Sequence, residues 1–472
     1  MLNVSDYPSA ERVFHFFEEI SKIPHGSGNT DKIADYLVGF ANEHALYVRR
    51  DEANNVIIRK NATRGYTDRP TVILQGHTDM VAEKTHDCTK NMLTDGLDIY
   101  RDGDLIRARG TTLGGDDGVA VAMALAILDS NDIPHPELEA IFTSDEEIGL
   151  LGAVALNTGD VRGRLLINID SDVEGIFTVG CAGGMRIDLH VPMRVTNSAK
   201  KCFEISVTGL KGGHSGIEID KGRENAVKIL AMMLSMLSAR LADVRGGNAD
   251  NAIPRAASAV IECGERSAED VLSLCELIAG EYREIEPEIS VTVKEYGDAV
   301  ICDAESSENL VSLLMEEPSG VIAMSSDIEG LVETSLNLGI LKCEGGEAVI
   351  SFSVRSAKGS EKAKLATRVT KTAENHGATY AIHGEYPAWE YRKDSHLRDV
   401  MCEVYRRMYQ KEAQVVTIHA GLECGIFCDK IEGLDCVSIG PDNYDIHTTE
   451  ERLSVSSTAR VWEFLKEVLK NI

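Results

Sequence analysis

The stretch Thr71-Val72-Ile73-Leu74-Gln75-Gly76-His77-Thr78-Asp79 joins a β-branched, apolar run to an abruptly polar end. Its first five residues predict a buried strand that ends at Gly76. His77 and Asp79 follow directly, so both side chains are expected at the carboxyl end of this strand. Ligands of open α/β sheets bind outside such strand ends. This stretch is therefore the starting point for predicting both the fold and the function.

The segments around this strand alternate between helical and extended patterns. The predicted helices cover residues 10–20, 31–43 and 119–128, and the predicted strands cover residues 56–59, 138–143 and 165–169. Such alternation is typical of a mixed or parallel sheet with helices on both faces. We therefore predict an α/β fold in which a mixed sheet is sandwiched by helices.

The pattern changes near residue 190 and changes back near residue 388. Between these points the predicted strands are 185–191, 202–210, 259–263, 290–295 and 348–355, and the predicted helices are 225–241 and 361–376. The tail returns to the first style, with helices at 395–409 and 456–469 and strands at 413–418 and 436–439. We predict one domain made of residues 1–190 and 388–472, interrupted by an α+β domain at 191–387.

Composition excludes several classes of partner. The 472 residues carry a formal net charge of -28, which repels phosphate backbones and anionic lipid headgroups, so we expect neither a nucleic acid nor a membrane partner. The longest apolar stretch, 119–128, is much shorter than the roughly 20 residues that span a bilayer. The eleven cysteines form no CxxC pair and no secretory signal precedes them, which favours reduced thiols in a cytoplasm.

Further acidic and imidazole residues follow the other predicted strands. Glu146 and Glu147 come just after strand 138–143, Asp170 ends strand 165–169, and His447 lies beyond strand 436–439. Asp116 stands apart, in a glycine-rich turn at 114–118 that enters a helix. We expect the sheet to bring these side chains to one edge.

These residue types suit divalent metal ions. Imidazole nitrogen and carboxylate oxygen bind Zn²⁺, Mn²⁺ or Co²⁺. Two cations about 3.5–4 Å apart can share one bridging carboxylate, which offsets their repulsion. Each piece alone also has an ordinary interpretation: His77 and Asp79 as a surface pair, residues 145–147 as a solvated turn, Asp170 as a helix cap. Their joint placement after successive strands favours a site.

Two neighbouring residues could support the chemistry of such a site. Glu146, beside a metal ligand, could take a proton from water and later deliver it to a leaving amine. Asp79 could accept the second ring N–H of His77 and so fix its tautomer.

The motifs in order along the chain resemble those of the M20 metallopeptidases, and within that family the aminoacyl-histidine dipeptidase branch. The matching stretches span nearly the whole chain: LQGHTDM (74–80), TLGGDDG (112–118), TSDEEIG (143–149), INIDS (167–171), GGHSG (212–216), NAIPR (251–255), HAGLECG (419–425) and IGP (439–441), which leads to His447.

The resemblance implies a set of roles for the metal centre. Asp116 would bridge two metal ions, with His77 and Asp170 completing one site and Glu147 and His447 the other. Glu146 would be the general base and acid, and Asp79 would orient His77. The metals would be zinc, with cobalt or manganese as alternatives. Asp117 departs from the family pattern, in which a smaller or amide residue is frequent, and its extra charge is expected to alter metal preference.

The resemblance also implies a lid domain in the insertion. His214 would stabilise the oxyanion, and Asn251 and Arg355 would hold the substrate carboxylate, because a guanidinium can donate bidentately. Each has a simpler interpretation, His214 as a turn residue and Arg355 as a surface ion-pair partner. Glu423 could meet the substrate amine or cap a helix.

The function implied is a dipeptidase that accepts small peptides, including β-Ala-His and other dipeptides ending in histidine, and that forms a homodimer. The alternatives within the family are an N-acyl-amino-acid deacylase and a tripeptidase. A different class of protein is a non-catalytic, metal-binding scaffold. A catalytically silent relative could lose the general base, whereas this chain retains Glu146, which argues against a scaffold. A serine hydrolase lacks support, since no GxSxG elbow occurs.

Overall fold

Strand β3 (Val72–His77), the element formed by the opening stretch, lies inside an eight-stranded sheet of order β1-β2-β6-β3-β7-β21-β8-β20. It pairs in parallel with β6 (Leu138–Thr143) and with β7 (Leu165–Asn168), and β7 pairs in parallel with β21 (Asp435–Ser438). The remaining strands are β1 (Tyr47–Arg50), β2 (Val56–Lys60), β8 (Ile176–Cys181) and β20 (Gln414–Ile418). Antiparallel pairing of β2 with β6 makes the sheet mixed.

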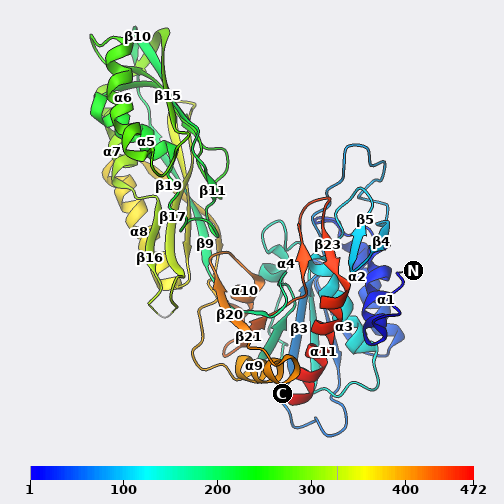
Figure 1. Cartoon of the computed structure of the whole chain (residues 1–472). Coiled ribbons are helices and arrows are strands. Elements are labelled where there is room, and N and C mark those ends of the chain that lie inside the picture. Colours follow the sequence, from blue (N-terminus) through cyan, green and yellow to red (C-terminus); the bar gives the residue numbers. More distant parts are fainter. Residues whose placement is uncertain (1, 327) are drawn as a thin grey trace. The chain divides into compact units, whose positions relative to one another are not determined.

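The computed structural model describes residues 2–326 and 328–472, which divide into two compact units (Figure 1). The first unit comprises residues 1–180, 391–417 and 422–472, and the second comprises residues 181–390 and 418–421. The predicted boundary at residue 190 falls within strand β9 (Gly183–Pro192), which pairs along its length with β18 (Glu347–Ser356) of the second unit.

Helices cover both faces of the first unit's sheet. One face packs against a large apolar core supplied by α1 (Glu11–Ser21), α2 (Asp31–Glu43), α3 (Gly115–Asp129), α9 (His396–Tyr409) and α11 (Val455–Asn471). The shorter helices α4 (Leu151–Ala155) and α10 (Glu423–Lys430) pack against each other, and α10 packs against β21. The predicted α/β fold with a helix-covered mixed sheet is confirmed.

Helix α3 sits unusually close to β3. A Cβ added at Gly76 would lie 2.5 Å from the Ala120 Cβ and 2.5 Å from Asp117 Oδ2, so glycine is required for this approach. Asp116 and Asp117, joined by a cis peptide bond, have non-helical backbone angles at the start of α3. The close approach therefore delivers Asp116 to the end of β3.

A small four-stranded sheet completes the first unit. Its order is β22-β23-β5-β4, formed by β22 (Asn443–Tyr444), β23 (Arg452–Ser454), β5 (Leu105–Ala108) and β4 (Ile99–Asp102). The short 3-10 helix η1 (Pro8–Ala10) precedes α1.

The second unit is built on a nine-stranded antiparallel sheet with helices on one side. Its strands are β15 (Ser290–Cys302), β10 (Val195–Thr208), β14 (Ala257–Glu262), β12 (Arg240–Gly246), β17 (Val332–Glu344), β18, β9, β19 (Thr379–Tyr386) and β16 (Gly320–Met324), the last paired to β17. Helices α5 (Ala226–Leu237), α6 (Ala268–Tyr282), α7 (Ala304–Glu316) and α8 (Gly359–Asn375) share its core. A separate pair joins β11 (Gly213–His214) and β13 (Ala252–Ile253).

The predicted helix 225–241 is too long. Helix α5 ends at Leu237, because Ser238 takes a left-handed backbone conformation with φ of 50°. The chain then enters β12, whose residues pair with β14 and β17. Pairing with two neighbouring strands outweighs the helical pattern of the sequence in this segment.

Within the described residues, none of the helices combines the length and the apolar character needed to cross a membrane.

Replacing Leu125 by alanine is expected to lower the free energy of unfolding of the first unit by about 2–5 kcal/mol. Leu125 lies in α3 with no exposed surface, so truncation leaves a cavity. The matched control is Leu93→Ala, because Leu93 is 65% exposed and its loss should cost less than about 0.5 kcal/mol. Urea unfolding followed by circular dichroism measures both, and equal losses would contradict this account of the core.

Candidate metal centre

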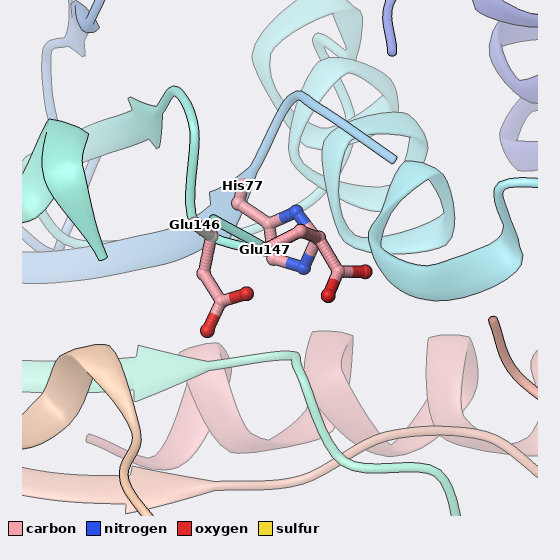
Figure 2. Close-up of side chains that lie close together, drawn as sticks. All are labelled: His77, Glu146 and Glu147. Carbon is pink, nitrogen blue, oxygen red and sulfur yellow. The ribbon is translucent and has the colours of Figure 1, made fainter. Parts of the chain in front are cut away.

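The carboxyl ends of three parallel strands bring four of the predicted residues to one edge of the sheet. His77 is the last residue of β3 and lies opposite Thr143, the last residue of β6. Glu146 and Glu147 occupy the turn just after β6, and Asp170 follows β7. Figure 2 shows the carboxylates of Glu146 and Glu147 beside the ring of His77.

Asp116 lies between two histidines, one on each carboxylate oxygen. His77 Nε2 is 3.0 Å from Asp116 Oδ1, and His447 Nε2 is 3.1 Å from Asp116 Oδ2. Asp116 comes from the start of α3, His77 from β3, and His447 from the loop between β22 and β23. Asp116 thus presents one carboxylate oxygen to each histidine, which fits the bridging role predicted for it.

The remaining predicted ligands lie on either side of Asp116. His77 Nε2 is 3.8 Å from Asp170 Oδ1, and His447 Nε2 is 2.9 Å from Glu147 Oε1. Two groups result, each with donor atoms within 4.8 Å of one another: His77 with Asp116 and Asp170, and Asp116 with Glu147 and His447. A third, overlapping group joins His77 with Glu146 and Glu147.

Asp79 contacts the other side of the His77 ring. The ring Nδ1 is 2.9 Å from the Asp79 backbone oxygen and 3.5 Å from its carboxylate. That carboxylate also accepts from the Ser27 hydroxyl at 2.7 Å and from the backbone N–H groups of Glu146 and Glu147. Asp79 thus links the histidine to the turn that carries both glutamates. Ser27 was not predicted, and nothing in its sequence context marks it.

The carboxylates of the centre raise the pKa of both histidines. Burial alone would lower the pKa of His77, but its contacts with Asp116 and Asp79 raise that pKa well above the ordinary value. Hydrogen bonds to Asp116 and Glu147 raise the pKa of His447 to about 10. Burial opposes ionisation of Asp116, yet both histidines lower its pKa. Both histidines thus lie in strongly negative surroundings, a setting that also favours bound cations.

The centre also holds more carboxylate groups than histidines. Burial raises the pKa of Asp170 well above its ordinary value, and the neighbouring Asp117 adds to the shift. Burial raises the pKa of Glu146 to about 8, with Glu423 and Glu147 contributing. Crowded, buried carboxylates are costly unless cations accompany them.

These observations fit a pair of divalent cations. Nitrogen and oxygen donors are grouped around a shared carboxylate, and the surplus of buried acid groups needs positive charge. His77, Asp116 and Asp170 would hold one ion, and Asp116, Glu147 and His447 the other.

Asp117, whose extra charge is expected to alter metal preference, lies buried beside the centre. Its side chain is only 2% exposed, and burial, with the adjacent Asp116, raises its pKa well above the usual value. Its Oδ2 accepts from the His77 backbone N–H at 3.1 Å. This hydrogen bond ties Asp117 to the end of β3, and the effect of Asp117 on metal preference stays a prediction.

Glu423 is the first residue of α10 and is fully buried. One carboxylate oxygen accepts from Gln75 Nε2 at 2.5 Å and from Thr143 Oγ1 at 2.7 Å, while the other has no hydrogen-bond partner. Burial raises the pKa of Glu423 to about 7. The N-cap of α10 is Leu422, so Glu423 connects helix and sheet beneath the centre.

His214, Asn251 and Arg355 belong to the second unit. The His214 Nδ1 accepts from the backbone N–H groups of Gly216 and Ile217 at 3.1 and 3.2 Å, which leaves Nε2 as the protonated nitrogen of the neutral ring. Burial lowers the pKa of His214, and Arg355 adds to this effect. Asn251 is exposed, and its backbone oxygen accepts from Ser215 N–H.

Arg355 has a partner that the sequence did not indicate. Its Nη1 donates to the Tyr386 hydroxyl at 2.9 Å, while its Nε is buried without a partner. Glycines flank the Tyr386 ring: an added Cβ would lie 2.5 Å from it at Gly184 and 2.7 Å at Gly421. This packing fixes the ring that orients the guanidinium.

The family model of the peptidases M20/M25/M40 matches residues 73–471. The chain belongs to this family. It is 36% identical to the cytosol non-specific dipeptidase of Escherichia coli over 475 residues, covering 98% of both chains. Among solved structures, the aminoacylhistidine dipeptidase of Vibrio alginolyticus matches at 34% identity and a TM-score of 0.91, over 98% of this chain and 97% of that one.

A more distant match shows that the fold is shared more widely. The aminopeptidase PepT of Bacillus cereus superposes with a TM-score of 0.62 at 16% identity, over 98% of each chain. That likeness concerns the fold alone.

Replacing His77 by alanine is expected to remove about one equivalent of bound metal per chain, because the substitution deletes one of three donors at one site. Elemental analysis after reconstitution with Zn²⁺ measures the stoichiometry. His86→Ala is the matched control, since His86 is exposed and outside the metal groups. Unchanged stoichiometry in His77→Ala would remove His77 from the ligand set.

Proposed function

We propose that this protein is a two-metal dipeptidase whose substrates include dipeptides ending in histidine. The observation that carries the proposal is the Asp116 carboxylate shared between His77 and His447, with Asp170, Glu147 and Glu146 beside it. The names of the two relatives above 30% identity, a non-specific dipeptidase and an aminoacylhistidine dipeptidase, support the substrate class. We propose zinc as the native metal, with cobalt or manganese as substitutes.

When bound, the metal ions polarise the peptide carbonyl and favour deprotonation of water. Glu146 is the group that moves protons. Its pKa of about 8 keeps a proton exchangeable near neutral pH, and the charge of neighbouring cations would favour the carboxylate form. Glu146 takes a proton from the attacking water and delivers it to the leaving amine, a transfer worth roughly 10²–10⁴-fold in rate.

Asp79 and Glu423 act from behind the reacting atoms. Asp79 holds the His77 ring and, through two backbone N–H groups, the turn that carries Glu146. Glu423 is fully buried, so its unpartnered oxygen would meet the substrate amine only if that oxygen became exposed.

We assign substrate binding to the second unit, which we propose acts as the lid domain. His214 donates from Nε2 to the oxyanion that develops on the substrate carbonyl, because its Nδ1 is already occupied as an acceptor. Arg355, oriented by Tyr386, and the exposed Asn251 hold the substrate carboxylate. A free terminal carboxylate close to the scissile bond would then distinguish dipeptides from longer peptides.

We further propose a cytoplasmic homodimer. Eleven free cysteines fit a reducing compartment, and the Escherichia coli relative is named a cytosol enzyme. The edge strands of the second unit, β15 and β19, are candidates for contacts between subunits. Light scattering coupled to gel filtration tests the dimer.

A hydrolysis panel tests the substrate class. The protein is stripped of metal, reloaded with Zn²⁺, Mn²⁺ or Co²⁺, and assayed on dipeptides, tripeptides and N-acyl amino acids. Preferred hydrolysis of dipeptides, β-Ala-His among them, is expected. Faster hydrolysis of N-acyl amino acids would replace the proposal by a deacylase, faster hydrolysis of tripeptides would replace it by a tripeptidase, and no hydrolysis would favour a scaffold.

Replacing Glu146 by glutamine is expected to lower kcat by at least about 10²-fold while metal content stays close to the wild-type value. The amide keeps the size of the side chain but cannot accept a proton. Glu83→Gln, an exposed position with the same change of charge, is the control. Substantial turnover in Glu146→Gln would assign the proton transfer to another group.

Replacing Arg355 by methionine is expected to reduce kcat/KM for dipeptides about 10- to 100-fold, mainly through KM, because a charge-assisted hydrogen bond is lost. Dipeptide amides, which lack the terminal carboxylate, should be hydrolysed at the wild-type rate. Arg245→Met, at an exposed arginine, is the control. Equal losses for acids and amides would show that Arg355 does not recognise the carboxylate.

A further inference from the structure

A buried carboxylate outside the predicted ligand set holds the loop that carries Asp116. Glu451, just before β23, is 3% exposed. Its Oε2 accepts from the backbone N–H groups of Leu113 and Gly114 at 2.7 and 2.9 Å. Its Oε1 accepts from those of Gly115 and Asp116 at 2.8 and 3.2 Å. Four consecutive backbone donors thus converge on one side chain.

The glycines of this loop make the convergence possible. Gly114 has a φ of 68°, in the left-handed region. A Cβ at Gly115 would lie 3.2 Å from Glu451 Oε1 and 3.0 Å from the Asn443 side chain. The backbone of residues 113–116 therefore packs closely around the Glu451 carboxylate, and a side chain at residue 115 would crowd it. Successive N–H groups arranged in this way form a concave site for an anion, here filled from within the chain.

Glu451 also belongs to the segment that supplies His447. Three residues lie between the two along the chain, and the Glu451 N–H donates to the Thr448 oxygen at 3.2 Å, which closes the turn between them. One end of this segment contacts Asp116 Oδ2 through the His447 ring, and the other end binds the Asp116 backbone. Both contacts to Asp116 therefore depend on one short stretch.

We infer that Glu451 is a positioning residue, which sets the place of the Asp116 carboxylate relative to His77 and His447. The inference rests on the proposed two-metal function. Glu451 is not itself assigned as a metal ligand, because both oxygens already accept two backbone N–H groups and it lies in none of the metal groups. It acts through Asp116, as outer-shell partners of metal ligands do.

The alternative is that Glu451 serves the fold alone. A merely structural carboxylate would change stability when replaced, and would leave the metal affinity of the folded protein unchanged. A positioning carboxylate would change the affinity and the coordination geometry even when the variant is folded. Metal binding, measured directly on the folded protein, separates the two.

The test is the variant Glu451→Gln, titrated with Co²⁺ after removal of metal. Glutamine keeps the shape of the side chain, but its amide group would face two N–H donors, so two of the four bonds are lost. We expect Co²⁺ affinity to fall about 10- to 100-fold, with an altered visible spectrum of the bound Co²⁺. Glu450→Gln is the matched control, because Glu450 is the adjacent residue and its side chain is 76% exposed.

A second variant approaches the same contact from the loop. Gly115→Ala crowds Glu451 Oε1 and should weaken Co²⁺ binding in the same direction by a smaller factor, so a Glu451→Gln protein that fails to fold does not end the test. Far-UV circular dichroism of the metal-free proteins reports on folding. The inference is supported if both folded variants bind Co²⁺ more weakly while Glu450→Gln stays within twofold of wild type.

Affinity within twofold of wild type in folded Glu451→Gln, or in folded Gly115→Ala where the glutamine variant does not fold, would overturn the inference. An equal loss in Glu450→Gln would overturn it too. These results leave the dipeptidase proposal standing if the wild-type protein hydrolyses dipeptides. Conversely, a wild-type protein that binds Co²⁺ but hydrolyses no dipeptide ends the proposed function without affecting the role of Glu451. A wild-type protein that binds no divalent cation would overturn both.

Discussion

The sharing of Asp116 between His77 and His447 is the contact on which the centre depends. One oxygen lies 3.0 Å from one imidazole and the other 3.1 Å from the second. Such a position requires backbone from three places to meet: the end of β3, the start of α3 and the loop before β23. Glycine at residue 76 lets the end of β3 and the start of α3 approach each other. Glu451, from the loop before β23, binds the backbone at the start of α3. Much of the local structure of the first unit therefore serves one carboxylate.

The same constraint explains the electrostatics of the site. Packing Asp117, Asp170 and Glu146 around Asp116 raises the pKa of each of the three through burial and mutual repulsion. A fold gains nothing from such crowding by itself, since buried acid groups cost free energy unless charges of opposite sign accompany them. Bound cations would make the arrangement favourable, so the proposed metal binding would also stabilise the fold.

The sequence predicted those parts of the structure that depend on local pattern. Residues 71–79 identified a buried strand with functional groups at its end, and β3 occupies Val72–His77. Helix 31–43 and strand 138–143 were predicted with the bounds that the structure gives. Where long-range pairing decides, the pattern failed: the predicted helix 225–241 runs past Leu237 into the first residues of β12, which pairs with β14 and β17.

The partners of the site were harder to predict than its proposed ligands. A histidine or aspartate at a strand end can be recognised in the sequence, because the apolar strand pattern stops where the polar residue begins, as at His77 and Asp170. Tyr386 and Glu451 act through distances set by tertiary packing, and nothing in their neighbourhood distinguishes them from ordinary surface residues. Recognising Glu451 requires seeing four backbone N–H groups converge, and these belong to residues more than three hundred positions earlier.

This separation along the chain has a consequence for how the centre forms. Strand β21 enters the sheet between β7 and β8, although more than two hundred and fifty residues separate it from both. His447 and Glu451 follow β21, so residues 1–180 alone lack one proposed ligand and the side chain that supports the Asp116 loop. Contacts between residues so far apart in sequence form late in folding, because the entropy cost of loop closure comes before the stabilisation that they provide. The proposed two-metal centre can therefore be complete only once the C-terminal segment has joined the sheet.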